Sequence, residues 1–522
     1  MNSGEKVVAN LGTRPVLENI QDLTIKQVVR VRRDIWKLEQ AQQWHPMINA
    51  YAEAVRIMKT RPASDPTSWA YQAAIHGNSV ADTWRNTCQH STWFFLPWHR
   101  MYLYWFERIC RAAIQSSPNV DPTTKANWAL PYWNYDRGTP TNQLPKAFRD
   151  TTTPSGDPNP LFVSGRNPSM AAGGGMPASV TSATSALAKH NFTGGSGGPA
   201  TSGGFGGPIT GFNHGGGAIG ELENVPHGAV HVTVGGLMGG FNTAGLDPIF
   251  WLHHCNIDRL WEVWDRQTTP ARTNPTTANW TTDLPFHFRN TSGADVTQVS
   301  GGVVNTRDQL RYVYDQFNLP FIRPDILQNI QRIPLPFPGP IPMPAGFTAP
   351  AEADQPDRPA ELAGATEEPV VLTGETVATS VSTSSAAAFR DDAPADPDRV
   401  YLNVEEIRAE GTPATPYEVY VNLPDDDETT DDHYQVGLVS LFGAAEASDP
   451  ESDHPEGLKY TFDITDLYKA MKEAGVWNDG DVKVTFKPVR VEMPAGASAA
   501  FTDLEPQPEP PVTIGRVSVF YQ

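Results

Sequence analysis

The chain has 522 residues, a hydrophobic content of 39% and a formal net charge of −20 at pH 7. This length exceeds what one hydrophobic core usually organises, so two or more domains are expected. The acidic balance argues against nucleic acid and against an anionic membrane surface as partners. The sequence has neither an apolar run long enough to cross a membrane nor the apolar core of a signal peptide, which favours a cytoplasmic location.

The N-terminal part predicts helices, because apolar residues recur at helical spacing between residues 17 and 60. The aromatic-rich tract that follows contains His76, His90 and His99. Pro97 suits the first position of a helix that carries His99. Because Pro97 also ends whatever segment precedes it, His90 is expected on a separate segment or loop.

Residues 150 to 217 are rich in Gly, Ser, Thr and Pro. This composition predicts a long irregular connection over the surface, with little core of its own. The next segment places His227 and His231 four residues apart, just after Pro226. Pro226 can begin a helical turn, and an i, i+4 pair shares one face of a helix.

The segment from Asp247 to Trp261 has apolar residues at helical spacing and two adjacent histidines, His253 and His254. Successive residues on a helix point about 100° apart, so these two imidazoles cannot both reach one point. One of them can be a metal ligand, and the other is then a neighbour that packs or hydrogen-bonds. Asp258 follows His254 by one helical turn.

The amino-acid composition and pattern change in the C-terminal part of the chain. Residues 323 to 397 are rich in Pro, Ala, Glu and Thr and predict a linker. From residue 398 to 522, alternating apolar and polar residues predict a small antiparallel β-sandwich-like domain. The expected fold is therefore mainly α, with a helical bundle over residues 1 to 322 followed by this β domain.

The histidines on these predicted helices fall into two triads, which suggests two metal ions. Any single buried histidine is more often a satisfied core residue than a ligand, but two clusters in the most aromatic part of the chain favour a dinuclear site. Imidazole nitrogens suit copper, zinc, iron and nickel, and the affinity order favours copper. Zinc is the competing metal. The six residues are His76, His90, His99, His227, His231 and His254.

Two long motifs, His90 to Arg100 and Asp247 to Trp261, resemble the two copper signatures of the tyrosinase, catechol oxidase and hemocyanin group. The Pro131–Asp136 segment and the Tyr312-Val-Tyr314 motif share this resemblance, which covers roughly residues 17 to 322. The C-terminal domain is more weakly similar to that of plant-type polyphenol oxidases. The resemblance implies two copper ions, one held by His76, His90 and His99 and the other by His227, His231 and His254.

The same resemblance implies supporting roles close to the ligands. His253 becomes a neighbour of the second copper, and Asp258 is expected to orient a ligand, as imidazole ligands usually require. Cys88 stands two residues before His90, at the spacing of the cysteine–histidine thioether found in fungal members and in molluscan hemocyanins. The alternative for Cys88 is a free buried thiol.

Further positions bear on the substrate. The resemblance implies that Phe241 lies over the first copper and that Glu223 holds a water molecule near the site. Their alternatives are a plain core aromatic and a carboxylate near a helix N-terminus. Val232, with His231, is expected to border the substrate entrance. Gly228 stands where several monophenol-hydroxylating members have an asparagine that assists proton removal, so catechol oxidation is favoured over monophenol hydroxylation.

The resemblance therefore implies an enzyme that oxidises o-diphenols to o-quinones with O2. It also implies a latent proenzyme, in which the C-terminal domain covers the copper site until a protease cuts the linker, with Leu441-Phe442 as a candidate plug. The alternative is a hemocyanin-like oxygen carrier, which would bind O2 reversibly without turnover. The sequence assigns neither the natural phenol nor the oligomeric state.

Overall fold

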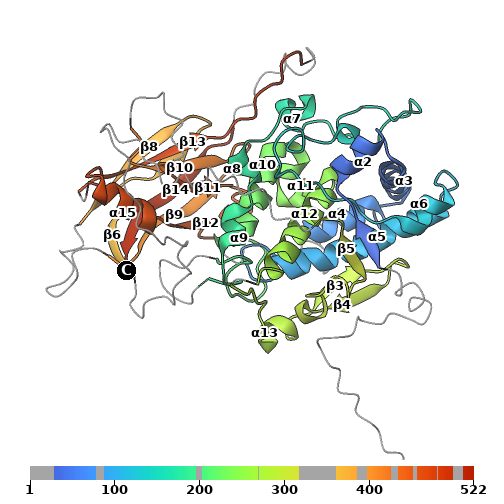
Figure 1. Ribbon diagram of the computed structural model, residues 1–522, viewed down its shortest axis with the longest axis horizontal. Coiled ribbons are helices and arrows are strands. Elements are labelled where there is room, and N and C mark those ends of the chain that lie inside the picture. Colours follow the sequence, from blue (N-terminus) through green and yellow to red (C-terminus); the bar gives the residue numbers. More distant parts are fainter. Residues whose placement is uncertain are drawn as a thin grey trace, which may run out of the picture.

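A helical domain comes first along the chain, a β domain follows, and the two lie side by side (Figure 1). Each domain has its own cluster of buried apolar residues. Among the residues described, no helix is both long and apolar enough to span a membrane. The computed structural model describes residues 29–77, 87–194, 203–268, 270–316, 360–384, 397–424, 433–450, 455–478, 480–497 and 509–522.

The helical domain is built around three helices of fifteen residues or more, α3, α5 and α12, with shorter helices packed about them. The α-helices are α2 (Ile35–Ala41), α3 (Pro46–Thr60), α4 (Trp69–His76), α5 (Phe95–Ser116), α6 (Pro122–Asn127), α7 (Pro168–Ala172), α8 (Ala178–Thr181), α9 (Thr184–Ala188), α10 (Ala229–Val234), α11 (Phe241–Ala244), α12 (Pro248–Asp265) and α13 (Ala278–Thr281). A π-helical turn, η2 (Glu223–Gly228), leads directly into α10.

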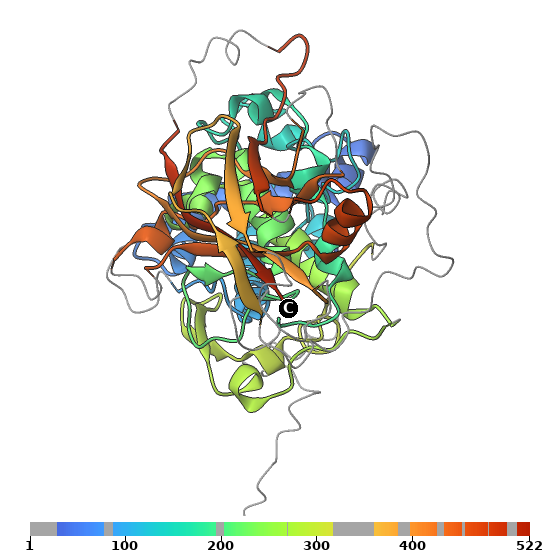
Figure 2. The ribbon, with the colours of Figure 1, turned by 90° about the vertical axis from the view of Figure 1, so that its left-hand side faces the viewer.

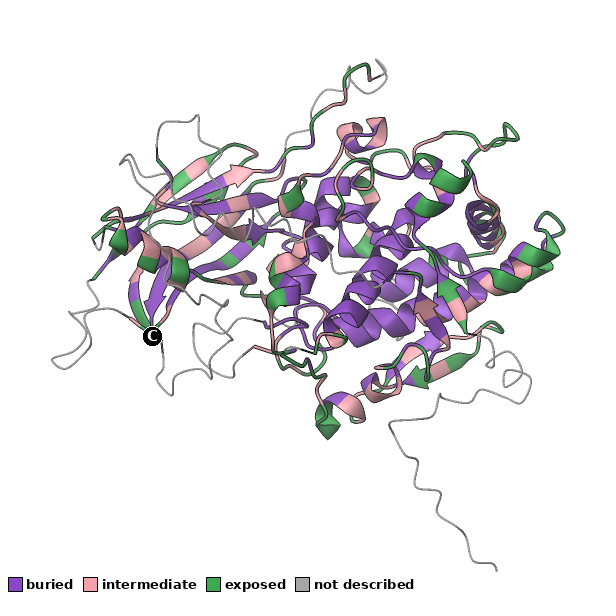
Figure 3. Ribbon diagram, viewed as in Figure 1, coloured by how far each residue is buried: buried purple, intermediate pink, exposed green. Residues whose placement is uncertain are grey.

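Helix α12 lies at the centre of this domain. All of its residues from Pro248 to Trp264 are buried, as the purple ribbon in Figure 3 shows. A helix that is buried all round belongs in the interior. It begins at Asp247, whose side chain accepts the N–H of Ile249, and Pro248 occupies its first turn. It packs against α5, so the two long histidine-bearing helices are neighbours.

Two small sheets also belong to the helical domain, β1 (Arg30–Arg32) with β5 (Tyr312–Tyr314) and β3 (Phe286–Arg289) with β4 (Asp295–Gln298). The prediction of helices from residue 17 to 60 is therefore wrong at 30–32, and residues 17–28 lie outside the described part of the chain. The reason is tertiary: Arg32 is buried, and its carboxylate partners come from distant helices.

The segment 150–217 connects parts of the helical domain and also contributes to its core. Its short helices α7 to α9 contribute fully buried side chains to the core of the helical domain, including Met170, Val180 and Ala186. Arg166 from this segment clamps the start of α12: its Nε donates to Asp247 Oδ2 at 2.8 Å and its Nη2 to Oδ1 at 2.6 Å. The expectation of a surface connection with little core is wrong here, because glycine and proline also occur in compact buried turns.

The β domain begins earlier than expected. Three strands between residues 361 and 383 belong to its sheet, so the predicted linker over 323–397 is wrong there. These strands are rich in Ala, Thr, Ser and Gly, which is why their composition resembled a linker. The strands are β6 (Glu361–Ala365), β7 (Val370–Leu372), β8 (Val377–Thr383), β9 (Val400–Ala409), β10 (Tyr417–Val421), β11 (Gln435–Val439), β12 (Leu458–Asp463), β13 (Val482–Pro488) and β14 (Val512–Tyr521).

These strands form an antiparallel sheet in two parts that join where β6 pairs with β8. One part has the order β11-β10-β13-β8 and the other β6-β14-β9-β12, and both contribute to one buried core. One helix, α15 (Thr465–Glu473), packs against this domain. The expectation of a mainly α chain therefore holds for the first domain alone.

The sheet extends into the helical domain. Strand β2 (Gly217–Ala218), from the end of the glycine-rich segment, pairs in parallel with Leu458 and Lys459 of β12. The Gly217 N–H donates to the Gly457 carbonyl at 2.9 Å. Seen from the β-domain side, the strands lie in front of the helices (Figure 2). The β domain thus packs over the face of the helical domain where η2 and α10 lie.

The Arg166–Asp247 clamp generates a stability prediction. Replacing Arg166 by alanine leaves a buried carboxylate at the start of α12 without its cation, and breaking a buried pair in this way costs about 3–5 kcal/mol. We expect a clear fall in the denaturation midpoint. Lys146→Ala is the matched control, because it removes a half-exposed partner of Asp150, which should cost at most about 1 kcal/mol. Equal midpoints for both variants would contradict the clamp.

Candidate metal centre

The first histidine triad converges in the interior. His76 ends α4, His90 lies in the loop before α5, and His99 lies in the first turns of α5. All three side chains are buried, and one ring nitrogen from each lies within 4.8 Å of the others. His76 Nε2 and His90 Nε2 are 3.3 Å apart.

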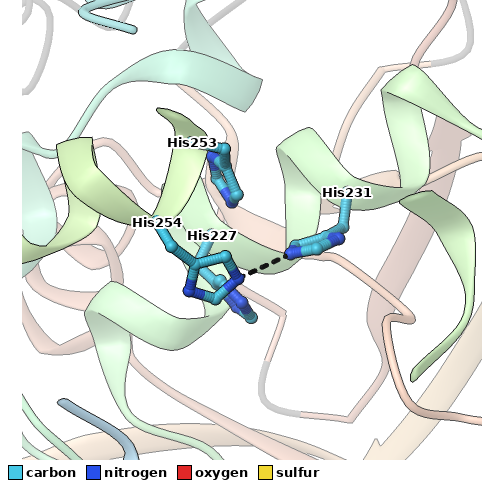
Figure 4. A group of neighbouring side chains, drawn as sticks. All are labelled: His227, His231, His253 and His254. Atoms are coloured by element: carbon cyan, nitrogen blue, oxygen red, sulfur yellow. Dashed lines mark hydrogen bonds between the residues drawn. The ribbon is translucent and has the colours of Figure 1, made fainter. Parts of the chain in front are cut away.

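A second group lies beside the first and contains four histidines, His227, His231, His253 and His254. His227 comes from η2, His231 from α10 and the adjacent pair from α12. Figure 4 shows His231 and His254 pointing at each other, and their Nε2 atoms are 3.2 Å apart. The two groups adjoin, because the rings of His99 and His254 stack with centroids 4.5 Å apart.

Hydrogen bonds fix the orientation of most of these rings. The Nδ1 atoms of His76, His99, His227 and His231 lie 2.7 to 3.1 Å from backbone carbonyl oxygens. A carbonyl can only accept, so each Nδ1 carries the proton and each Nε2 keeps a free lone pair. The Nε2 atoms of His99 and His227 are buried without a hydrogen-bond partner. Buried lone pairs aimed at one another are suited to a metal ion.

The electrostatics keep these imidazoles neutral. Burial lowers the pKa of His99 and of His231 to about 3. Burial and neighbouring imidazoles also hold the pKa values of His76, His227 and His254 well below the usual histidine range. Neutral imidazole is the form that binds metals. The residues therefore fit two metal ions with all-nitrogen donor sets, as copper prefers.

His253 differs from its neighbour. Its Nδ1 lies 3.1 Å from the hydroxyl of Tyr135, and its ring lies nearly parallel to that of His227, with centroids 5.5 Å apart. His254 is held instead by ring contacts, against Phe250 at 4.2 Å and against His99.

Asp258 does not orient a histidine. Its carboxylate is bound by the buried guanidinium groups of Arg100 and Arg32 and by the hydroxyls of Tyr312 and Tyr314. Burial alone would raise the pKa of Asp258, but the two arginines, together with the hydrogen bonds from Tyr312 and Tyr314, outweigh it and hold the pKa below its usual value. The predicted role is wrong: Asp258 ties α12 to α5, β1 and β5, partners that its spacing from His254 could not reveal.

Glu223 contacts His90 of the first triad through its side chain, whereas the Cys88 backbone N–H donates to the His76 carbonyl at 3.3 Å. Both oxygens of Glu223 accept the N–H of Ser91, at 2.8 and 3.0 Å, and one lies 3.1 Å from His90 Nδ1. Burial raises the pKa of Glu223 to about 8. Cys88 is a buried free thiol whose Sγ lies 3.2 Å from Nδ1 of His214. The thioether to His90 stays a prediction.

Phe241 lies against the first triad. Its ring stacks on His90 with centroids 4.1 Å apart, and its carbonyl accepts the proton of His76 Nδ1. Val232, expected near the entrance, is fully buried on α10. Gly228 lies beneath the β domain, because a Cβ added there would be 2.5 Å from Ser440 Oγ.

The β domain closes the centre with one aromatic side chain. Phe442 stacks on His231 with ring centroids 4.1 Å apart and lies 4.7 Å from Phe241 and 5.4 Å from His227. Leu441, before it, has a left-handed backbone with φ of +65° and a side chain buried in the β domain. We refer to the β domain, from residue 360 onward, as the lid. Phe442 is the part of the predicted Leu441-Phe442 plug that enters the centre.

Sequence reasoning missed two residues that attach the lid, Asn224 and Glu446, and a third, His214, that contacts Cys88. Asn224 binds the backbone at Leu438 and Ser440, and Glu446 of the lid accepts the N–H of Phe241 at 3.2 Å. His214 pairs with Cys88. No local pattern marks these residues, because each acts across a long separation in the chain.

Comparison with known proteins agrees with this geometry. Residues 66–267 match the common central domain of tyrosinase, and residues 359–522 match a domain of unknown function. A tyrosinase of Hahella sp. (strain CCB-MM4) is 30% identical over 529 residues, covering 94% of this chain and 99% of the relative. A chloroplastic polyphenol oxidase of Malus domestica is 27% identical and covers 88% of this chain and 75% of the relative.

Solved structures share the two-domain fold. A latent apple tyrosinase matches with a TM-score of 0.55 and 24% identity, over 95% of this chain and 98% of that one. A latent aurone synthase matches with a TM-score of 0.58 and 20% identity, over 94% and 90%. This chain belongs to the tyrosinase family. It is a polyphenol oxidase that acts on phenols with O2 at two copper ions, and the comparisons give no support to the oxygen-carrier alternative.

Glu446 generates a prediction on pH. Burial between lid and helical domain raises the pKa of its carboxyl above the ordinary value of 4.5. When the lid opens, the carboxyl meets water and its pKa falls back. The closed state is therefore favoured fully below the ordinary pKa and loses this contribution as pH rises through the raised value.

We expect the turnover of full-length enzyme, relative to cleaved enzyme, to increase as the pH rises from the ordinary carboxyl pKa of 4.5 through the raised pKa of Glu446. Glu446→Gln removes the titration and should flatten this increase. Glu456→Gln, also in the lid, is the control. An unchanged pH profile in the Glu446 variant would contradict the role of this carboxyl.

Proposed function

We propose that this protein is a latent catechol oxidase, kept inactive by the Phe442 side chain of its own lid. The observation that carries the proposal is the Phe442 ring stacked on His231, between the second histidine group and Phe241. A phenolic substrate would need the space that this ring fills. The names of similar structures, a latent apple tyrosinase and a latent aurone synthase, support the same reading.

The six predicted histidines are proposed as the copper ligands. His76, His90 and His99 would hold the first copper, and His227, His231 and His254 the second. His254 is favoured over His253 because its Nε2 lies 3.2 Å from that of His231 and its ring stacks on His99 of the first triad. When bound, the two copper ions supply the O2-binding and electron-accepting chemistry.

The protein's own contribution is to hold the rings and exclude water. The Nδ1–H bonds to backbone carbonyls prevent the imidazoles from rotating, so each Nε2 keeps its direction without a metal. Phe95, Phe241 and Phe250 pack against the ligand rings and keep the centre dry. Strong ligands fixed in a water-free cavity are what a site for O2 chemistry requires.

Diphenols are the favoured substrates. Proton removal from a monophenol needs a general base within reach. Gly228 offers no side chain for this task. Glu223 is committed to the Ser91 N–H and to His90, which leaves it poorly placed to accept a substrate proton. A catechol is already at the oxidation level from which two electrons can be removed.

Activation would follow a cut between the two domains. The helical and β domains have separate cores, so a cleaved chain can lose the lid without losing the core around the histidines. An activating protease, small phenolic substrates and O2 are the proposed partners. The oligomeric state is left unassigned.

The ligand assignment predicts copper content. Copper-loaded protein should contain two copper ions per chain, and His231→Ala should lose the second because one of its three nitrogens is gone. His253→Ala is the matched control, since it removes a buried imidazole of the same group, and it should keep both ions. Atomic absorption on purified protein measures this. A His253 variant that loses copper as His231→Ala does would refute the assignment.

The plug predicts the effect of Phe442→Ala in the full-length chain. Removing the ring opens the space above His231, so catechol turnover should increase by about tenfold or more, because each 1.4 kcal/mol of lost closure is a factor of ten. Oxygen consumption measures the rate. Phe520→Ala, which removes a buried phenylalanine elsewhere in the lid, should leave the enzyme latent. Equal activation by both would point to general loosening of the lid rather than to a plug.

A further inference from the structure

His253 lies close enough to the second histidine group to be a ligand, so distance alone does not keep it off the metal. One of its ring nitrogens lies within 4.8 Å of ring nitrogens of His227, His231 and His254, and Figure 4 shows the four rings together. Only a nitrogen with a free lone pair binds a metal. The tautomer of His253, that is, which ring nitrogen carries its proton, therefore decides whether it can be a ligand.

The hydrogen-bond partner of His253 Nδ1 is a hydroxyl rather than a carbonyl. The Tyr135 Oη atom lies 3.1 Å from Nδ1. A carbonyl oxygen can only accept, so it fixes a proton on Nδ1, whereas a hydroxyl can donate its own proton to the Nδ1 lone pair. If Tyr135 donates, the single proton of the neutral His253 ring is on Nε2.

The groups around Tyr135 favour its hydroxyl as the donor. Arg259 Nε donates to Asn256 Oδ1 at 3.0 Å, which leaves the amide N–H groups of Asn256 for Tyr135. Burial raises the pKa of the Tyr135 phenol, and the Asn256 side chain acts in the opposite direction, as a donor to the phenol oxygen does. An oxygen that accepts from Asn256 has its own proton left for His253.

The far side of the His253 ring agrees with this direction. Burial and the His231 imidazole lower the pKa of His253, whereas the His227 backbone carbonyl acts to raise it, as an acceptor of a ring N–H does. With Nδ1 facing Tyr135, that N–H is at Nε2. Among the described residues, neither Asn256 Nδ2 nor His253 Nε2 has a partner at ordinary hydrogen-bond geometry, so these two contacts act by longer-range attraction.

The orienting groups are anchored to one another. Arg259 Nη2 donates to Asn134 Oδ1 at 2.8 Å and lies 3.7 Å from Asp136 Oδ2. These two partners flank Tyr135 in the chain, and Arg259 lies six residues after His253 on α12. One side of α12 and one short segment, residues 134–136, therefore hold the hydroxyl and the imidazole in register.

We infer that Tyr135 is a positioning residue, which keeps the proton of His253 on Nε2 and so prevents His253 from becoming a fourth ligand of the second copper. His227 and His231 have the opposite tautomer, because their Nδ1 atoms face carbonyls. The inference rests on the proposed function, because it concerns the same copper ligands. A copper ion with three nitrogen ligands keeps a position for O2, which a fourth imidazole would occupy.

The first test needs no metal. In metal-free, full-length protein with isotope-labelled histidine rings, NMR correlations between the ring nitrogens and the ring C–H protons distinguish the two tautomers. His253 should carry its proton on Nε2, and Tyr135→Phe should move that proton to Nδ1, fully or in part. His253→Gln assigns the signal. A proton on Nδ1 of His253 in the unaltered chain, or an unchanged signal in the Tyr135 variant, would overturn the inference and leave the proposed function intact.

The second test uses copper-loaded, full-length protein. Tyr135→Phe removes one hydroxyl and keeps the ring, so X-ray absorption should detect an additional nitrogen ligand on copper. A chelator should remove the second copper about tenfold more slowly, the effect of one hydrogen bond to an imidazole. Tyr51→Phe is the matched control, because it removes a buried hydroxyl bound to the Pro248 carbonyl at the start of α12. It should change neither measurement.

Catechol oxidation by the holoenzyme cut between its domains completes the test. Tyr135→Phe should slow it about tenfold, because the additional imidazole competes with O2. Adding His253→Gln removes that imidazole and should restore the rate. A merely structural role for Tyr135 would leave the double variant as slow as the single one and would speed copper loss, and either result would overturn the inference. An unaltered cut enzyme that oxidises no catechol would contradict the proposed function instead, while the NMR measurement still decides the tautomer.

Discussion

The hydrogen bond from a histidine Nδ1 to a backbone carbonyl is the interaction on which this structure depends. Four of the six proposed ligands make it, and the carbonyls come from α5, η2, η3 (Gly236–Gly239) and α11. Each bond selects one tautomer and leaves Nε2 facing the interior. Burial then keeps the imidazoles neutral, since charging several of them within 4.8 Å would be costly. Helix α12, buried on all sides and clamped at Asp247, holds His254 against this array.

The lid binds to the same residues that form the metal centre. Phe442 stacks on one proposed ligand, Asn224 binds the strand that leads to it, and Glu446 holds the backbone of Phe241, whose carbonyl in turn holds His76. The same residues therefore hold the lid closed and shape the metal centre. This arrangement places Leu441, a non-glycine residue, in the left-handed backbone region. Surrounding contacts must enforce that conformation, because it is unfavourable for a residue with a side chain.

The sequence predicted the histidine clusters well because their chemistry is encoded locally. His227 and His231 share a helical face, and His90, His99 and His254 lie in long motifs. What it predicted poorly depends on residues far apart in the chain. Asp258 stands one turn after His254, yet it binds Arg32 and Arg100 from β1 and α5. The strands from 361 to 383 are poor in large apolar residues, so their place in the sheet follows from pairing with β13 and β14 rather than from composition.

The most direct test of this account is a crystal structure of the full-length, copper-loaded protein with anomalous scattering recorded at the copper edge. The account requires two copper peaks, each bound by three histidine Nε2 atoms, with His253 outside both coordination shells and the Phe442 ring over His231. A single copper, a ligand bound through Nδ1, or a centre open to solvent beneath the lid would contradict it.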